Sequence, residues 1–101
     1  MINNRWVQTK VFRLWVREFK ETHMIKDIVI EDGTEDTRTH KIMNSLEKAC
    51  REFDLAVPIW LEDNIDSFKK TSKARFRQGS FIEEIPFDYL EILVIEEDPS
   101  Y

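Results

Sequence analysis

Glycine and cysteine are scarce in this chain of 101 residues, which holds two glycines and one cysteine. With only Gly33 and Gly79, no glycine-rich loop that cradles a nucleotide phosphate can be built. The single cysteine, Cys50, excludes an intrachain disulfide. Its position on the apolar side of an expected helix predicts a buried thiol rather than a reactive one.

Long apolar runs are missing as well. No stretch approaches the roughly 18 apolar residues that a membrane-spanning helix needs, and the first residues lack the apolar centre of a signal peptide. We therefore expect a cytoplasmic protein that makes no membrane contact. No linker, internal repeat or low-complexity segment interrupts the sequence, so residues 1–101 are expected to form a single domain.

Motifs that carry catalysis or bind cofactors are also absent. His23 and His40 have no cysteine or carboxylate arranged around them for zinc, and no acidic group has the spacing of a calcium loop. We expect no catalytic residue, no metal site and no cofactor, and hence a protein that is not an enzyme. A small hydrolase or isomerase with a carboxylate in the 83–91 region is the third possibility, although no base, nucleophile and orienting group converge there.

Hydrophobic periodicity predicts the secondary structure. Lys10 to Lys20 alternates as a long strand, Ile25 to Ile30 is a β-branched second strand, and Phe87 to Glu97 is apolar enough on both sides for the middle of a sheet. The first two strands are expected to form a hairpin with a bulge or a loose loop, because no glycine or asparagine marks a tight turn. Residues 71–79 alternate weakly and form a fourth candidate strand.

One amphipathic helix is expected from Thr37 to Phe53, and one or two helical turns are expected within Glu62 to Lys70. Leu55 to Leu61 is predicted to be a short edge strand or an extended buried segment. These elements predict an α+β fold, with a mainly antiparallel sheet of about four strands and one main amphipathic helix packed on one face.

A single helix covers only one face of such a sheet, which leaves apolar side chains on the other. The 58–70 segment or a second subunit would have to cover them. We therefore favour a non-enzymatic, self-associating interaction module, with a homodimer or a protein partner as the expected assembly. The residues expected at this interface are Trp15, Phe19, Tyr89 and Leu93.

The charges suggest a second hypothesis. The formal net charge is −5, yet five cations and one aromatic residue fall within Lys69 to Arg77, here called the basic segment. One interpretation is a nucleic-acid-associated factor, in which the cations contact phosphates and the ring stacks on a base. The alternative is a solvated surface paired with acidic flanks such as Glu62, Asp63, Asp66, Glu83 and Glu84. The residues expected to contact phosphate are Lys69, Lys70, Lys73, Arg75, Phe76 and Arg77.

The C-terminal third carries Arg75-Phe76, Phe81, Glu83-Glu84, Phe87 to Ile92 and Val94 to Asp98. This pattern resembles the C-terminal segment of small bacterial proteins of the Firmicutes type that have no assigned function. The resemblance implies a bacterial accessory protein. It supplies no activity, cofactor or catalytic residue.

Overall fold

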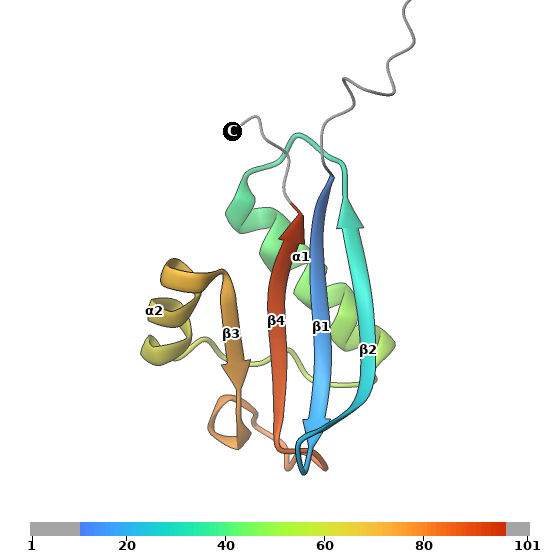
Figure 1. Cartoon of the computed structure of the whole chain (residues 1–101), viewed down its shortest axis with the longest axis vertical. Coiled ribbons are helices and arrows are strands. Elements are labelled where there is room, and N and C mark those ends of the chain that lie inside the picture. The colour runs from blue at the N-terminus through green and yellow to red at the C-terminus, as the bar shows by residue number, and fades with distance from the viewer. Residues whose placement is uncertain (1–10, 97–101) are drawn as a thin grey trace, which may run out of the picture.

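The computed structural model describes residues 11–96 (Figure 1). Four antiparallel strands form one sheet in the order β2-β1-β4-β3, and the expected α+β fold is confirmed. The predicted strand ends at Lys10 and Glu97 lie outside the described residues. The elements are β1 (Phe12–Lys20), β2 (His23–Asp32), α1 (Arg38–Glu52), α2 (Glu62–Thr71), β3 (Lys73–Phe76), the 3-10 helix η2 (Gln78–Ser80) and β4 (Tyr89–Glu96).

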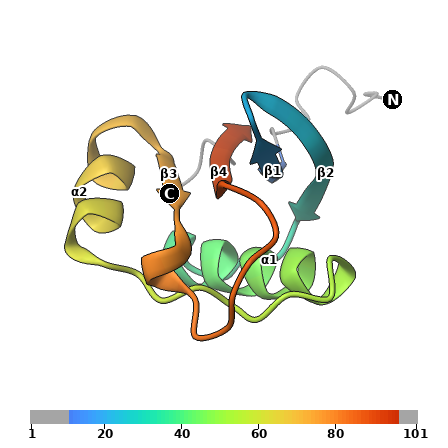
Figure 2. The same ribbon diagram turned by 90° about the horizontal axis from the view of Figure 1, so that it is seen from below.

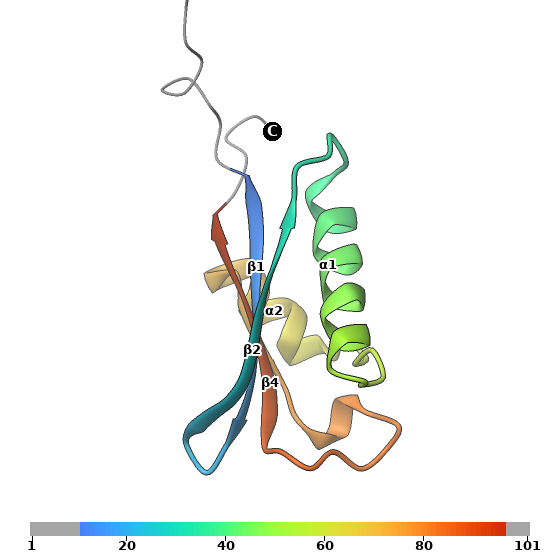
Figure 3. The same cartoon turned by 90° about the vertical axis from the view of Figure 1, so that its right-hand side faces the viewer.

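The molecule has two layers, because α1 and the segments that join α1 to α2 and β3 to β4 lie on one side of the sheet (Figures 2 and 3). Strand β1 shows why: Phe12, Leu14 and Val16 are buried beneath α1, while the residues between them are only half-buried. We call the side under α1 the covered face and the other side the open face. The buried core on the covered face also includes Leu46, Ala49, Cys50, Ala74, Phe76, Leu90 and Ile92.

Helix α1 begins after Thr37, whose side-chain hydroxyl accepts a hydrogen bond from the backbone N–H of His40 at 3.2 Å. Its apolar side is completely buried at Leu46, Ala49 and Cys50. The buried thiol predicted for Cys50 is therefore confirmed. Burial, together with the nearby charge of Glu18, raises the pKa of this thiol to about 12.

The segment after α1 forms no strand. The expected burial is wrong as well, because within residues 55–61 only Pro58 is buried, and Val57, Ile59 and Leu61 are exposed. Ile59 N–H donates to the carbonyl of Ser80 at 2.7 Å. Helix α2 is ten residues long, more than the one or two turns expected. Buried Asn64 fixes its position, since its Oδ1 accepts from Leu61 N–H at 2.9 Å and its Nδ2 donates to the carbonyl of Arg75 at 2.7 Å.

Helix α2 also protects one edge of the sheet. Besides the bond from Asn64, Ser67 Oγ donates to the carbonyl of Lys73 at 2.8 Å. Side chains from α2 thus satisfy two carbonyl groups of β3, the strand at that edge. Strand β2 forms the opposite edge of the sheet.

The β1–β2 turn is tighter than the sequence predicts. Lys20 pairs with His23, so only Glu21 and Thr22 connect the strands, and both have positive φ angles of 52° and 69°. This is the twist that two-residue hairpins require, here adopted without glycine or asparagine. The expected bulge is present as well, as a register shift between Glu18 and Phe19.

Replacing Glu21-Thr22 by Asn-Gly should raise the free energy of unfolding by about 1 kcal/mol, because Asn and Gly adopt positive φ at lower cost. Urea denaturation followed by circular dichroism measures the change. The double substitution E83N/E84G places the same pair in a loop without positive φ and should give no gain. An unchanged or lower midpoint for E21N/T22G would contradict the strain assigned to this turn.

Candidate functional site: the open face of the sheet

Strand register arranges the open face in rows. One row is aromatic and apolar, with Tyr89, Phe19 and Met24 as neighbours across β4, β1 and β2. The next row alternates in charge across all four strands, and the third is again mainly apolar. The second row is Arg75, Glu91, Arg17 and Asp27, and the third is Lys73, Leu93, Trp15 and Val29.

Glu91 holds the centre of the charged row. It is only 2% exposed, although it points away from the covered core. The guanidinium of Arg17 donates to its Oε1, and Arg75 Nε donates to its Oε2 at 2.8 Å. One buried carboxylate therefore binds two arginines from the strands on either side and fixes both guanidinium groups over the sheet.

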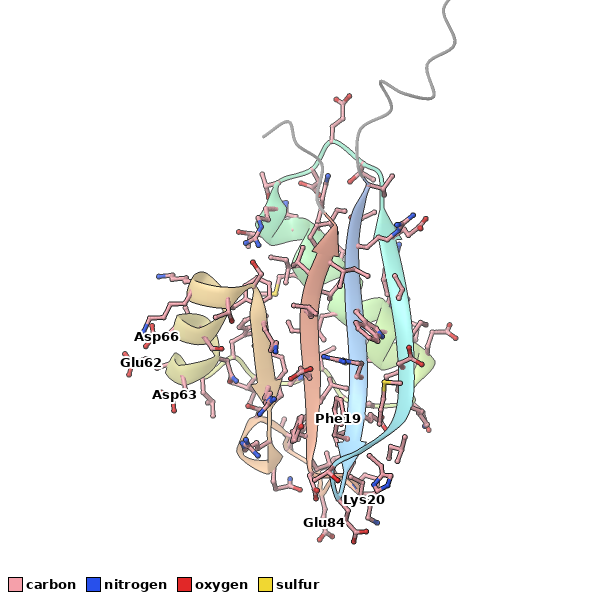
Figure 4. The ribbon with its side chains drawn as sticks, in the orientation of Figure 1. Phe19, Lys20, Glu62, Asp63, Asp66 and Glu84 are labelled. Atoms are coloured by element: carbon pink, nitrogen blue, oxygen red, sulfur yellow. The ribbon has the colours of Figure 1, made fainter. Side chains whose placement is uncertain are left out.

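Aromatic rings lie beside these guanidinium groups. The rings of Phe19 and Tyr89 stack with centroids 5.1 Å apart, and Phe19 lies in front of the sheet in Figure 4. Arg17 is 4.1 Å from the ring centre of Trp15 and 5.2 Å from that of Phe19. Arg75 is 4.9 Å from the ring centre of Tyr89. Flat π-systems and flat cations thus alternate across the open face.

The four residues expected at an interface come together on this face. Phe19 stacks on Tyr89, and Trp15 is the register partner of Leu93. All four are half-buried. The 58–70 segment does not cover them, because Trp60 packs edge-on against Phe68 and Phe76, two residues of the buried core.

The basic segment is divided by the fold. Lys73 and Arg75 lie in the rows of the open face, and Arg77 lies 5.2 Å from the ring centre of Tyr89. Lys69 and Lys70 are in the last turn of α2, outside the sheet.

Phe76 was expected to stack on a base, and this prediction is wrong: the ring is completely buried under the sheet. Period-two alternation places Phe76 on the face opposite Arg75 and Arg77.

The acidic flanks expected to neutralise the basic segment do not pair with it among the described residues. Arg75 instead pairs with Glu91, from the neighbouring strand. Glu62, Asp63 and Asp66 point away from the sheet on the outer side of α2 (Figure 4). The cations of the open face are therefore not cancelled by these acids.

Two carboxylates of the 83–91 region, Asp88 and Glu91, have structural partners, whereas Glu83 and Glu84 are exposed. Asp88 Oδ2 accepts a hydrogen bond from the backbone N–H of Glu21 at 2.8 Å, and the backbone N–H of Asp88 donates to the carbonyl of Phe19 at 2.8 Å. These two hydrogen bonds connect the β1–β2 turn to the start of β4. Glu91 is held by its two arginines. Within residues 11–96, no group of three or more His, Cys, Asp or Glu side chains is placed to hold a metal ion.

The residues expected at the interface did not include Arg17, and Glu91 was considered only as one of the carboxylates of the 83–91 region. The alternation of arginines with aromatic residues in β1 was visible and placed Arg17 beside Trp15 and Phe19. Nothing in the sequence places Glu91 between β1 and β3, because that depends on the order of the strands.

A different carboxylate, Glu18, lies on the covered face, where it is 4% exposed. Burial raises the pKa of Glu18, and the charge of Lys26 on β2 works in the opposite direction. The unfolded chain loses this proton near the ordinary value of 4.5. The folded state then binds the proton more tightly, so the free energy of unfolding falls as pH rises from about 4.5 through the raised pKa.

Glu18→Gln removes this titration and should stabilise the protein at pH 7. Its advantage over the parent should shrink as the pH is lowered toward 4, where Glu18 is protonated in both states. Thermal melts at intervals of pH from 4 to 7 measure the difference. Glu35→Gln, in an exposed loop, is the control. A constant difference across this range would contradict the pKa assigned to Glu18.

Comparison with known proteins adds no relative to these observations. The chain matches no protein-family profile, no curated protein and no solved structure. Among the residues that the structure describes, no helix is both long and apolar enough to cross a membrane.

Proposed function

We propose that this protein is a non-enzymatic interaction module that binds its partner on the open face of the sheet. One observation carries the proposal: Trp15, Phe19 and Tyr89 lie half-exposed, among ordered arginines, on a face that no other described element covers. A folded domain that gains nothing from this face would not need three aromatic rings there, since burying them would stabilise it further.

The arrangement supports binding better than catalysis. Glu91 and Asp88, the best-placed carboxylates, already accept hydrogen bonds from Arg17, Arg75 and the β1–β2 turn. These donors are guanidinium and backbone groups, neither of which serves as a nucleophile or a base. The face instead presents fixed rings and fixed cations, which are the side chains most often enriched at binding surfaces.

Amide chemical-shift mapping tests this proposal with probes of three kinds: the protein itself at rising concentration, a poly-glutamate peptide and a single-stranded oligonucleotide. Any probe that binds should shift the signals of β1 and β4 and leave the outer side of α1 unchanged. Trp15→Ala should weaken that response, whereas Met43→Ala, on the exposed side of α1, should not. Shifts that gather on α1, or no response to any probe, would overturn the proposal.

Self-association is the second candidate, and the uncovered edge of the sheet favours it. Strand β2 is an edge strand with exposed Met24, Ile25 and Val29, whereas the β3 edge is capped by α2. Light scattering on a size-exclusion column, at several concentrations, measures the mass. A dimer that Val29→Lys converts to a monomer would support assembly through β2, and a monomer at all concentrations would remove this candidate.

A further inference from the structure

We propose that the partner of the open face is single-stranded nucleic acid, bound with its bases on the rings of Trp15, Phe19 and Tyr89 and its phosphates on Lys73, Arg75 and Arg77. This inference rests on the proposed function, since it names the occupant of the same face. Two properties of the face support it, its charge and its flat side chains.

The charge of the face favours an anionic partner. On the open face, β3, β4 and the residue after β3 present three described cations, Lys73, Arg75 and Arg77, and one described carboxylate, Glu91. Arg17 on β1 has Asp27 of β2 as its other neighbour in the charged row. The side of the open face over β3 and β4 is therefore positively charged. An anionic partner is complementary to it.

The surplus charge is available to a ligand. Lys73 and Arg77 form no ion pair in the part of the chain that the structure describes. Arg75 is shared with Glu91, yet its side chain is 48% exposed. The acids that make the whole chain negative include Glu62, which points away from the sheet (Figure 4). Two described acids of the open face lie on β2, where Asp27 accepts a hydrogen bond from Trp15 Nε1 and Glu31 accepts one from Arg13 Nε.

The flat side chains separate nucleic acid from an acidic protein as the partner. Bases stack on aromatic rings and on guanidinium planes, whereas Glu and Asp side chains have no π-face to offer. Arg17 lies against Trp15 and Phe19, and Phe19 stacks on Tyr89. The open face thus carries three half-buried aromatic rings beside a row of cations.

Single strands fit this face better than duplexes. The bases of a duplex are stacked on one another and cannot reach a ring without being unpaired. The expected binding is independent of sequence, because every base has a π-face. It should also weaken steeply with salt, as counterions are displaced from each contacted phosphate.

Fluorescence anisotropy with a labelled oligothymidylate tests the inference, starting at about 50 mM salt. Two double substitutions each remove two positive charges: K73A/R77A from the open face and K48A/R51A from the outer side of α1. We expect K73A/R77A to weaken binding about tenfold or more and to reduce the salt slope by about 0.7 for each phosphate that is no longer neutralised. K48A/R51A should leave the dissociation constant within about twofold of the parent's.

The proposed stacking of bases on the aromatic rings is tested with Tyr89→Leu, which keeps an apolar side chain and removes the aromatic ring. Binding should weaken roughly fivefold to a hundredfold. A melting temperature close to the parent's shows that the fold survives, and Trp15→Leu is the second variant should Tyr89→Leu unfold. Leu61→Ala, on the exposed segment before α2, is an apolar control that should bind as the parent does.

The inference is overturned if oligothymidylate does not bind at about 50 mM salt, or if K73A/R77A and K48A/R51A lose affinity equally. It is also overturned if a hairpin duplex binds more tightly than oligothymidylate, or if poly-glutamate displaces oligothymidylate as well as unlabelled oligothymidylate does. A response of β1 and β4 to poly-glutamate or to the protein itself, but not to oligothymidylate, would refute nucleic acid and keep the proposed function. Oligothymidylate shifts confined to α2 would refute both.

Discussion

Phe76→Ala should lower the free energy of unfolding by about 3–5 kcal/mol, a large part of the 5–15 kcal/mol that holds a small domain together. The ring is completely buried and packs edge-on against Trp60 with centroids 5.0 Å apart. Removing it leaves a cavity between the sheet and the segment that leads into α2. Urea denaturation followed by circular dichroism measures the loss.

Phe19→Ala is the matched control for this substitution, because it removes the same ring from the open face. Phe19 is half-buried and stacks on Tyr89, so we expect a smaller loss of stability and a clear loss of oligonucleotide binding. Phe76→Leu should retain most of the stability and the parent's affinity. A stable Phe76→Ala variant that loses only affinity would contradict the burial of this ring and restore it as a stacking residue.

The contrast between these two phenylalanines shows what the sequence could predict. Alternation in β1 separates Phe12, Leu14 and Val16 from the residues of the open face, and the structure has the same two sets. The apolar side of α1 was equally clear, because Leu46 and Cys50 recur at helical spacing. Local periodicity therefore predicts which face a side chain occupies.

The same periodicity predicts that Phe76 is buried. Lys73, Arg75 and Arg77 alternate with Ala74 and Phe76, so a strand here must place the ring opposite the cations. The weak alternation of residues 71–79 already indicated a strand, yet the basic segment was treated as one contact surface that included Phe76. Composition alone predicts that a segment is basic, and strand geometry is needed to divide it into its two faces.

Other features depend on contacts that a single sequence does not reveal. The tight turn at Glu21 and Thr22 lacks the glycine or asparagine that such turns usually contain. Its hydrogen bond to Asp88 joins two residues that are 67 positions apart in the sequence. The position of α2 depends on Asn64, which reaches the carbonyl of Arg75. Such long-range partners are fixed by tertiary packing, which overrides local propensity.

The pairing of Glu91 also depends on tertiary structure, and it leads to the last prediction. Glu91→Gln should lower the free energy of unfolding by about 3 kcal/mol, because it leaves two guanidinium groups without their carboxylate. Arg17 is affected most, since its side chain is only 16% exposed. Arg75→Gln removes a partner that is 48% exposed and should cost less than about 1 kcal/mol.

Stability and binding should respond to Glu91→Gln in opposite directions. The substitution removes the one described carboxylate among the cations over β3 and β4, so a folded Glu91→Gln protein presents one more net positive charge to a phosphate chain. Anisotropy below the melting temperature should therefore show affinity at least equal to the parent's, with a salt dependence at least as steep. Weaker binding by a folded Glu91→Gln variant would mean that the fixed geometry of the two arginines, rather than their charge, is what the partner requires.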